Sequence, residues 1–207
     1  METSCTRDTE TSLESLLGKL LARTSGSLSN VLIVGKDRRL REAVAHAFHD
    51  ARSYGDGTFS SLNCRGELES LRSAFVALFT ALTRGRDSTP ARLSGVTFGG
   101  TLFIDEIEWM DIESQKTCLD FLKELQRQRN ESPRSMRLRV VAGTSCNLYE
   151  AAARGRFLPG LLDLLDKVRV ELDREGPRLS AKRYACSRLT GESDVNLSQA
   201  QLRPTKQ

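Results

Sequence analysis

Two adjacent carboxylates, Asp105 and Glu106, are the residues whose types and spacing could do chemistry. They follow the run Gly99-Gly-Thr-Leu-Phe-Ile104, which has the pattern of a strand buried on both faces. Open α/β sheets bind their ligands at the carboxyl ends of the strands, where these acids are placed. Asp105 could hold Mg²⁺ directly or through water, and Glu106 could polarise a water molecule for attack on a γ-phosphate. Such a site also needs a phosphate-binding loop upstream.

Apolar segments alternate along the chain in the order that is typical of an α/β fold, a parallel, doubly wound sheet flanked by helices. A further helix is expected to start at Thr11, which forms a capping box with Glu14. We expect strands over 31–35, 59–64, 99–107, 137–143 and 168–172, and helices over 39–51, 68–82, 112–129, 147–154 and 158–165.

The pattern divides the chain into three parts. Residues 1–10 are expected to be disordered, residues 11–178 to form one α/β domain, and residues 179–207 to form a basic polar tail. From Arg174 onward, seven basic and three acidic residues give a charge of +4, which equals the charge of the whole chain. The neutral body argues against a dedicated nucleic-acid-binding domain. The tail is interpreted as solubilising rather than as a contact for nucleic acid or an acidic partner.

Composition bounds the class of protein. With 39% hydrophobic and 28% charged residues, the chain fits a single globular domain. No apolar run approaches the length of a membrane-spanning helix, and the polar N-terminus with its acids does not have the pattern of a secretory signal. The five cysteines show no C-x-x-C spacing, which indicates free thiols in a reducing cytosol. We therefore expect a cytoplasmic protein without membrane contact.

Two other groups of residues are open to more than one interpretation. His46 and His49, the only histidines, could share one face of a helix, but no third ligand is evident. Plain helix surface is therefore preferred to a metal site. Trp109 and Met110 follow the acids and form either an exposed patch for a partner or local packing, of which packing is favoured.

The stretch from Gly99 to Ile107 resembles G-G-T-L-F-L-D-E-I, the Walker B motif in the AAA+ domain of sigma-54-dependent transcription activators. Further matches follow in order over about residues 10–178: Val31–Gly35 resembles the first strand, Asn63-Cys64 the N-C pair, Arg139–Ala142 with Thr144 the sensor strand R-V-I-A-A-T-N, and Gly155-Arg-Phe157 the motif G-R-F. The resemblance implies an AAA+ P-loop NTPase-like core, ATP with Mg²⁺ as cofactors, and an AAA+ activator subunit or sigma-54 RNA polymerase as partners.

The departures from this family fall on the residues that would bind ATP. The family's phosphate loop, G-E-x-G-T-G-K-E, corresponds to Gly35-Lys-Asp-Arg-Arg-Leu-Arg-Glu42. Arg38 and Leu40 replace glycines, so Cβ atoms crowd the path of the phosphates. Arg41 replaces the lysine, and its planar fork does not copy a compact ammonium. By the resemblance, the nucleotide-binding residues would be Gly35, Arg41, Glu42 and Asp105, with Asp105 also the Mg²⁺ ligand and Glu106 a vestigial water activator.

Other functional positions of the family also differ. Ser145 replaces the sensor asparagine, and Leu158 and Leu164 replace the arginines that reach into a neighbouring subunit's ATP site. The sigma-contacting motif G-A-F-T-G-A has no counterpart near residues 82–87. The sequence also predicts that the helical lid is absent and that no helix-turn-helix follows.

These observations predict a degenerate AAA+ domain. The expected function is that of a non-catalytic, partner-binding pseudo-ATPase in transcription regulation, a monomer or small oligomer without direct DNA binding. Two alternatives stay open: a weak ATPase in which Arg41 takes the lysine's role beside Asp105 and Glu106, and a remnant of gene decay that folds but does little.

Overall fold

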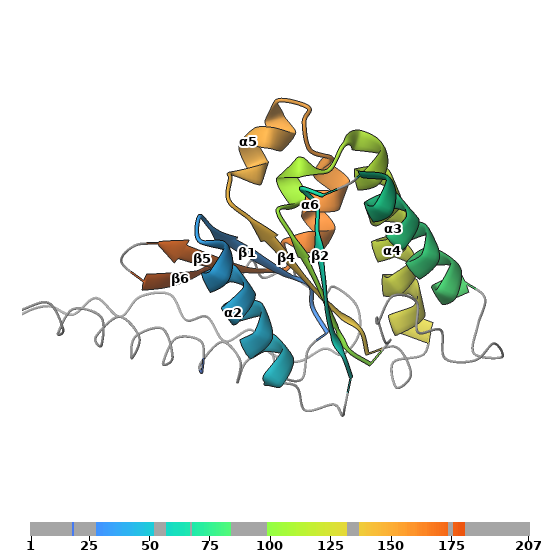
Figure 1. Ribbon diagram of the computed structural model, residues 1–207, viewed down its shortest axis with the longest axis horizontal. Coiled ribbons are helices and arrows are strands. Elements are labelled where there is room, and N and C mark those ends of the chain that lie inside the picture. Colours follow the sequence, from blue (N-terminus) through green and yellow to red (C-terminus); the bar gives the residue numbers. More distant parts are fainter. Residues whose placement is uncertain are drawn as a thin grey trace, which may run out of the picture.

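The computed structural model describes residues 28–51, 57–66, 68–83, 99–131, 137–173 and 176–180, together with Gly18. Its centre is a six-stranded sheet in the order β2-β3-β4-β1-β5-β6 (Figure 1). Five strands run parallel, and β6 pairs antiparallel with β5. The predicted parallel α/β sheet is therefore confirmed. The strands are β1 (Val31–Gly35), β2 (Phe59–Asn63), β3 (Thr101–Asp105), β4 (Arg139–Thr144), β5 (Val168–Asp173) and β6 (Gly176–Ser180).

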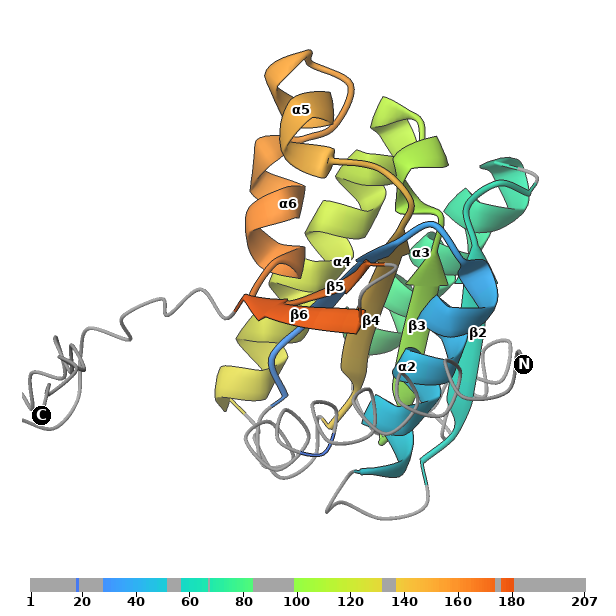
Figure 2. The ribbon, with the colours of Figure 1, turned by 90° about the vertical axis from the view of Figure 1, so that its left-hand side faces the viewer.

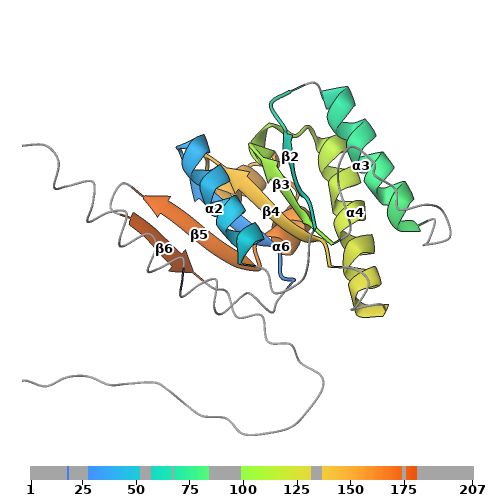
Figure 3. The ribbon, with the colours of Figure 1, turned by 60° about the horizontal axis from the view of Figure 1, so that its bottom comes forward.

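Helices cover both faces of the sheet, which is why β3 and β4 are buried along their whole length. Figure 2 shows α2 on one face, with α4 and α6 on the other, and Figure 3 shows the sheet between α2 and α4 from below. α3 packs against α4, and α5 packs against α6. The helices are α2 (Arg38–Asp50), α3 (Leu68–Thr83), the short 3₁₀ helix η1 (Ile107–Trp109), α4 (Ile112–Glu131), α5 (Leu148–Ala153) and α6 (Pro159–Leu165).

Two clusters of buried apolar side chains fill the layers between the sheet and the helices. The smaller cluster lies under α2 and includes Phe48 and Phe103. The larger cluster joins α3, α4 and α6 to the other face of the sheet. Within it, the rings of Phe75 and Phe121 lie 6.2 Å apart where α3 meets α4. Each fully buried side chain of this size contributes about 1.5–3 kcal/mol, so both layers hold the sheet firmly.

The predicted strands and central helices agree with the structure to within two residues at each end. β6 was not predicted, because the sequence from Asp173 shows little periodicity and backbone pairing with β5 does not depend on such periodicity. The expected helix from Thr11 and the polar loop over 84–95 lie outside the described residues. Of the predicted tail over 179–207, residues 179 and 180 belong to β6. The rest of the tail, on which the prediction of an absent lid also depends, lies outside the described residues.

The carboxyl ends of the parallel strands meet at one edge of the sheet. The register of β2 and β3 places Asn63 beside Asp105, and that of β1 and β4 places Val34 beside Thr144. Gly35 ends β1 next to β5. This edge is the position at which open α/β sheets bind ligands, so the fold gathers the predicted site residues at one place.

Candidate functional site

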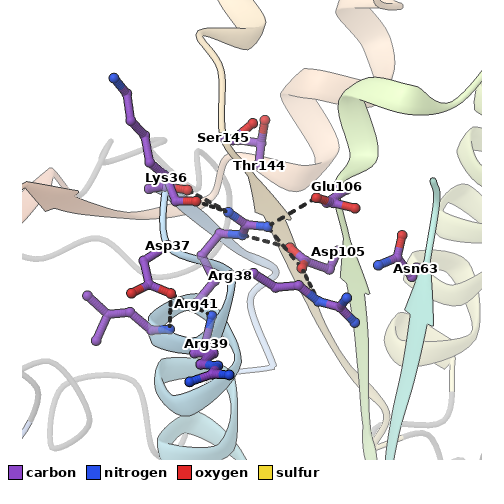
Figure 4. A network of polar contacts seen from close by, with 12 residues as sticks. Lys36, Asp37, Arg38, Arg39, Arg41, Asn63, Asp105, Glu106, Thr144 and Ser145 are labelled. Carbon is purple, nitrogen blue, oxygen red and sulfur yellow. Dashed lines mark hydrogen bonds and ion pairs between the residues drawn. The ribbon is translucent and has the colours of Figure 1, made fainter.

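A buried ion pair between Arg41 and Asp105 forms the centre of the site (Figure 4). Arg41 Nε donates to Asp105 Oδ1 at 2.7 Å, and Nη2 donates to Oδ2 at 3.0 Å. Both oxygens of the carboxylate are thereby engaged. The side chains are only 1% and 4% exposed. Bidentate pairs of this kind are strong and specific in geometry, and the loss of either partner would leave a buried charge uncompensated.

The same guanidinium closes the turn between β1 and α2. Arg41 Nη1 donates to the carbonyl oxygens of Gly35 at 2.6 Å and of Lys36 at 3.3 Å. Gly35 itself lies so close to β5 that a Cβ there would be 2.8 Å from the Cβ of Leu172. The structure thus brings together three of the predicted nucleotide-binding residues, Gly35, Arg41 and Asp105.

Asp37 caps the first turn of α2 with its carboxylate. Its Oδ1 accepts from the backbone N–H of Arg39 at 2.8 Å and from that of Leu40 at 3.4 Å. The N–H groups at a helix N-terminus attract anions such as phosphate, and here a carboxylate of the chain itself takes that place. Arg38 and Leu40, at the family's glycine positions, lie in the first turn of α2. Lys36 and Asp37 alone separate β1 from α2, which leaves no glycine-rich loop to wrap around a phosphate.

Gly143 on β4 makes room for the ion pair. A Cβ at this position would lie 2.3 Å from Asp105 Oδ1 and 3.1 Å from the ring of Phe103. The family motif that β4 resembles has alanine here. Sequence reasoning did not single out Gly143 or the capping role of Asp37, although the change from alanine to glycine in R-V-I-A-A-T-N was a visible signal.

Glu106 lies beside the pair in a left-handed backbone conformation, with φ 56° and ψ 42°. Its Oε1 is 4.0 Å from Arg41 Nη2 and 3.9 Å from Arg65 Nη1. The predicted catalytic residue is therefore close to the site, but it faces two guanidinium groups. Glu42, the fourth predicted nucleotide-binding residue, lies on α2, and none of the polar contacts found among the described residues joins it to this network.

The side chains at the positions of the family's sensor and arginine fingers make contacts outside the Arg41–Asp105 network. The backbone N–H and the hydroxyl of Ser145 donate to Glu108 Oε1 at 3.0 and 2.6 Å, which ties the end of β4 to η1. Leu158 and Leu164 pack against the larger apolar cluster. Neither leucine can supply positive charge to a neighbouring site.

The other sequence candidates have structural contacts. The ring of His46 stacks on Phe59 at 3.8 Å, and His49 Nδ1 lies 3.1 Å from Thr101 Oγ1. Across the described part of the chain, no group of three or more His, Cys, Asp or Glu side chains is placed to hold a metal ion.

Burial raises the pKa of the Cys64 and Cys118 thiols, which keeps them protonated. Within the described residues, no helix combines the length and apolar character of a membrane span.

Comparison with solved structures defines the class of fold. NtrX from Brucella abortus in complex with ATP matches with a TM-score of 0.57 and 25% identity, over 77% of this chain and 36% of that one. The same protein in complex with ADP matches with a TM-score of 0.54 and 22% identity, over 76% and 34%. Together with the parallel sheet and the carboxylates at its edge, this likeness defines the core of an AAA+ P-loop NTPase fold.

The chain belongs to the Sigma-54 interaction domain family, whose model matches residues 8–171. It is 31% identical to the C4-dicarboxylate transport transcriptional regulatory protein DctD of Pseudomonas aeruginosa, over 69% of this chain and 34% of that protein. It is 30% identical to the DNA-binding transcriptional regulator NtrC of Escherichia coli K12, over 83% and 36%. The chain thus spans about a third of the length of these relatives.

Proposed function

We propose that this chain is a non-hydrolysing, partner-binding module in transcription regulation, a pseudo-ATPase that keeps the AAA+ core. The Arg41–Asp105 pair carries this proposal. Mg²⁺ takes oxygen ligands, and both oxygens of Asp105 accept hydrogen bonds from the guanidinium. A metal ion on Asp105 would either share this one carboxylate with the Arg41 guanidinium, which places two like charges together in a buried site, or displace the guanidinium and leave its charge buried without compensation. As arranged, these residues do not fit Mg²⁺–ATP.

Two further observations support the proposal. The Asp37 carboxylate occupies the N–H groups of α2 that would otherwise meet a phosphate, and it would repel one. Leu158 and Leu164 pack inward at the finger positions. An arginine finger is worth roughly 10³–10⁵ in rate where it has been measured, so this chain would also not complete the ATP site of a neighbour.

The proposed partners are an AAA+ activator subunit or sigma-54 RNA polymerase, because relatives of this family are named as transcriptional regulators, two of them as sigma-54-dependent. We place the protein in the cytoplasm, as a monomer or small oligomer. Co-purification with an activator or with sigma-54 RNA polymerase, followed by size-exclusion chromatography with light scattering, tests this part. A chain that captures neither of them would favour the gene-decay remnant.

A titration with a fluorescent ATP analogue and Mg²⁺ tests the loss of the ATPase function. We expect no saturable binding and no phosphate release. NtrX from Brucella abortus, which was solved in complex with ATP, is the positive control for binding. Micromolar binding that is lost on Asp105→Ala, in a variant that circular dichroism shows to be folded, would overturn the proposal and favour the weak ATPase with Arg41 in the lysine's role.

A further inference from the structure

Two exposed arginines and an exposed tryptophan lie beside the buried pair. Arg38 is 58% exposed and lies 3.6 Å from Asp105 Oδ2, and Arg65 is 63% exposed and lies 3.9 Å from Glu106. The guanidinium of Arg65 lies 4.9 Å from the centre of the Trp109 ring, which is itself 53% exposed. Arg38, Arg65 and Trp109 are called the rim strip below.

The backbone turn at Glu106 places Trp109 on the surface. Glu106 begins η1 as a left-handed residue, the one non-glycine with positive φ in the described chain. This turn buries Ile107 and Met110 and leaves Trp109 in solvent. The favoured expectation of local packing is therefore correct for Met110 and wrong for Trp109. Backbone conformations of this kind are costly and cluster at functional sites, yet Glu106 has no catalytic partner in the proposed function.

Arg65 is fixed on the other side of the strip. The backbone N–H of Arg65 donates to Asn63 Oδ1 at 2.8 Å, and that of Cys64 donates to the carbonyl of Asp105 at 3.0 Å. The turn after β2 is thereby tied to the end of β3, which sets the Arg65 guanidinium over the indole. A guanidinium over an indole face is attracted by the negative charge of that face, so the two side chains form one unit of the strip.

The charge that faces solvent at this edge is positive, although the edge holds several acids. The side chains of Asp105 and Glu106 are only 4% and 15% exposed, and Asp105 is already satisfied by Arg41. Figure 4 shows Arg38 extending from α2 toward Asp105, while Lys36 points away from the pair. Arg38 and Arg65 are therefore more accessible to an incoming group than the carboxylates of Asp105 and Glu106 are.

We propose that the rim strip docks an acidic segment of a partner protein that carries an aromatic or aliphatic residue. This rests on the proposed function, because it requires that nucleotide does not occupy the edge. Carboxylates of the segment would meet Arg38 and Arg65, and its apolar side chain would cover Trp109. Tryptophan and arginine are the residues that most often dominate binding energy at interfaces. A nucleic-acid backbone fits less well, because residues 1–173 carry no net charge, whereas nucleic-acid-binding domains are basic.

Selection of short random peptides displayed on phage against the full chain tests the proposal. We expect enrichment of peptides that combine Asp or Glu with an aromatic or aliphatic residue. The affinity of the synthetic peptides should fall by at least about tenfold for Arg65→Glu and for Trp109→Ala. Lys123→Glu on α4 and Val76→Ala on α3 change an exposed cation and an exposed apolar residue elsewhere and should leave the affinity unchanged.

Each contrary outcome overturns the docking proposal: no enriched peptide, enriched peptides without acids, equal binding by Trp109→Ala and wild type, or tighter binding of a single-stranded oligonucleotide than of the peptides. Circular dichroism of each variant confirms that it is folded. The ATP titration reports separately on the proposed function, so a chain that binds no nucleotide and no acidic peptide would contradict the rim strip alone.

Discussion

Arg41 and Asp105 form a pair from which neither partner can be removed alone without a large loss of stability. Arg41→Met leaves the carboxylate of Asp105 buried without its bidentate donor. Because an uncompensated buried charge costs about 3–5 kcal/mol, the free energy of unfolding in urea should fall by that order. Lys116→Met is the control: it breaks an exposed pair with Glu113 and should change the free energy of unfolding little.

The double variant Arg41→Met/Asp105→Asn separates the free energy of the Arg41–Asp105 interaction from the other contacts of the two side chains. Without the acid, the missing guanidinium no longer leaves a charge uncompensated. The decrease in unfolding free energy of the double variant should therefore be smaller than the sum of the decreases in the two single variants by about 0.5–3 kcal/mol. Strictly additive losses would contradict a coupled pair and would assign the effect of Arg41 to its packing and to its bonds to the Gly35 and Lys36 carbonyls.

Gly143→Ala tests whether the room beside Asp105 matters. The added Cβ would lie 2.3 Å from Asp105 Oδ1, so the carboxylate or the backbone must shift. Overpacking of this kind costs about 1–3 kcal/mol. Gly160→Ala on α6 is the matched control, because its Cβ would make an ordinary 3.8 Å contact with Leu119, and it should be neutral or stabilising. A stabilising Gly143→Ala would contradict the role given to the glycine.

The residues of the site were predictable only in part. Asp105, Arg41 and Gly35 follow from a motif and its spacing. That Arg41 would turn inward and bind both oxygens of Asp105 depends on a contact across 64 residues, which neither periodicity nor charge reveals. The capping role of Asp37 depends likewise on where α2 begins, and helix boundaries are the least certain part of a sequence-based prediction.

At the scale of elements, Asp111 joins two helices. Its Oδ1 accepts from the backbone N–H of Ser114 at 2.9 Å in the first turn of α4, and its other oxygen pairs with Arg72 on α3. Loss of such a cap costs about 0.5–2 kcal/mol. Asp111→Ala should therefore weaken the contact between α3 and α4, while Asp111→Asn should keep most of the cap.

The pH dependence of stability checks the role of Asp111. Hydrogen bonds from Ser114 and Arg72 lower the pKa of Asp111 below its ordinary value. A carboxyl group with a lower pKa in the folded chain contributes stability that is present above its unfolded pKa of about 3.9 and is lost as the pH falls through the folded pKa. The difference in unfolding free energy between wild type and Asp111→Asn should be constant near neutral pH and shrink below about pH 4. A difference that widens in acid would contradict this.

The elements with an apolar pattern were predictable because burial dictates the pattern. β3 and β4 read as continuous apolar runs since helices cover both of their faces, and α2, α4 and α6 show helical spacing since each packs one face on the sheet. β6 lies at the edge, and its backbone pairing with β5 leaves no such trace in the sequence. The exposure of Trp109 was mispredicted because it depends on the left-handed turn at Glu106, which no sequence rule for a glutamate indicates.

For the whole molecule, the proposed function means that the chain itself fills the positions at which a nucleotide would bind. The carboxylate of Asp37 lies on the N-terminus of α2, and the guanidinium of Arg41 lies on Asp105. The first contact caps α2 itself, and the second ties α2 to β3 in the sheet. The folded state should therefore gain nothing from Mg²⁺–ATP.

Thermal unfolding with and without Mg²⁺–ATP tests this independence. A ligand present at 100 times its dissociation constant stabilises the folded state by about 2.7 kcal/mol. For a chain of this size, that raises Tm by roughly 5–10 °C. NtrX from Brucella abortus, solved with ATP, should show such a rise, whereas this chain should show none at the same millimolar concentration. A rise that disappears in Asp105→Asn would mean that Arg41 yields the carboxylate to the metal ion. A ligand can stabilise a fold only by binding the folded state more tightly than the unfolded one. Such a rise would therefore mean that the folded chain binds Mg²⁺–ATP, and that the buried pair is the nucleotide-free state of a working site.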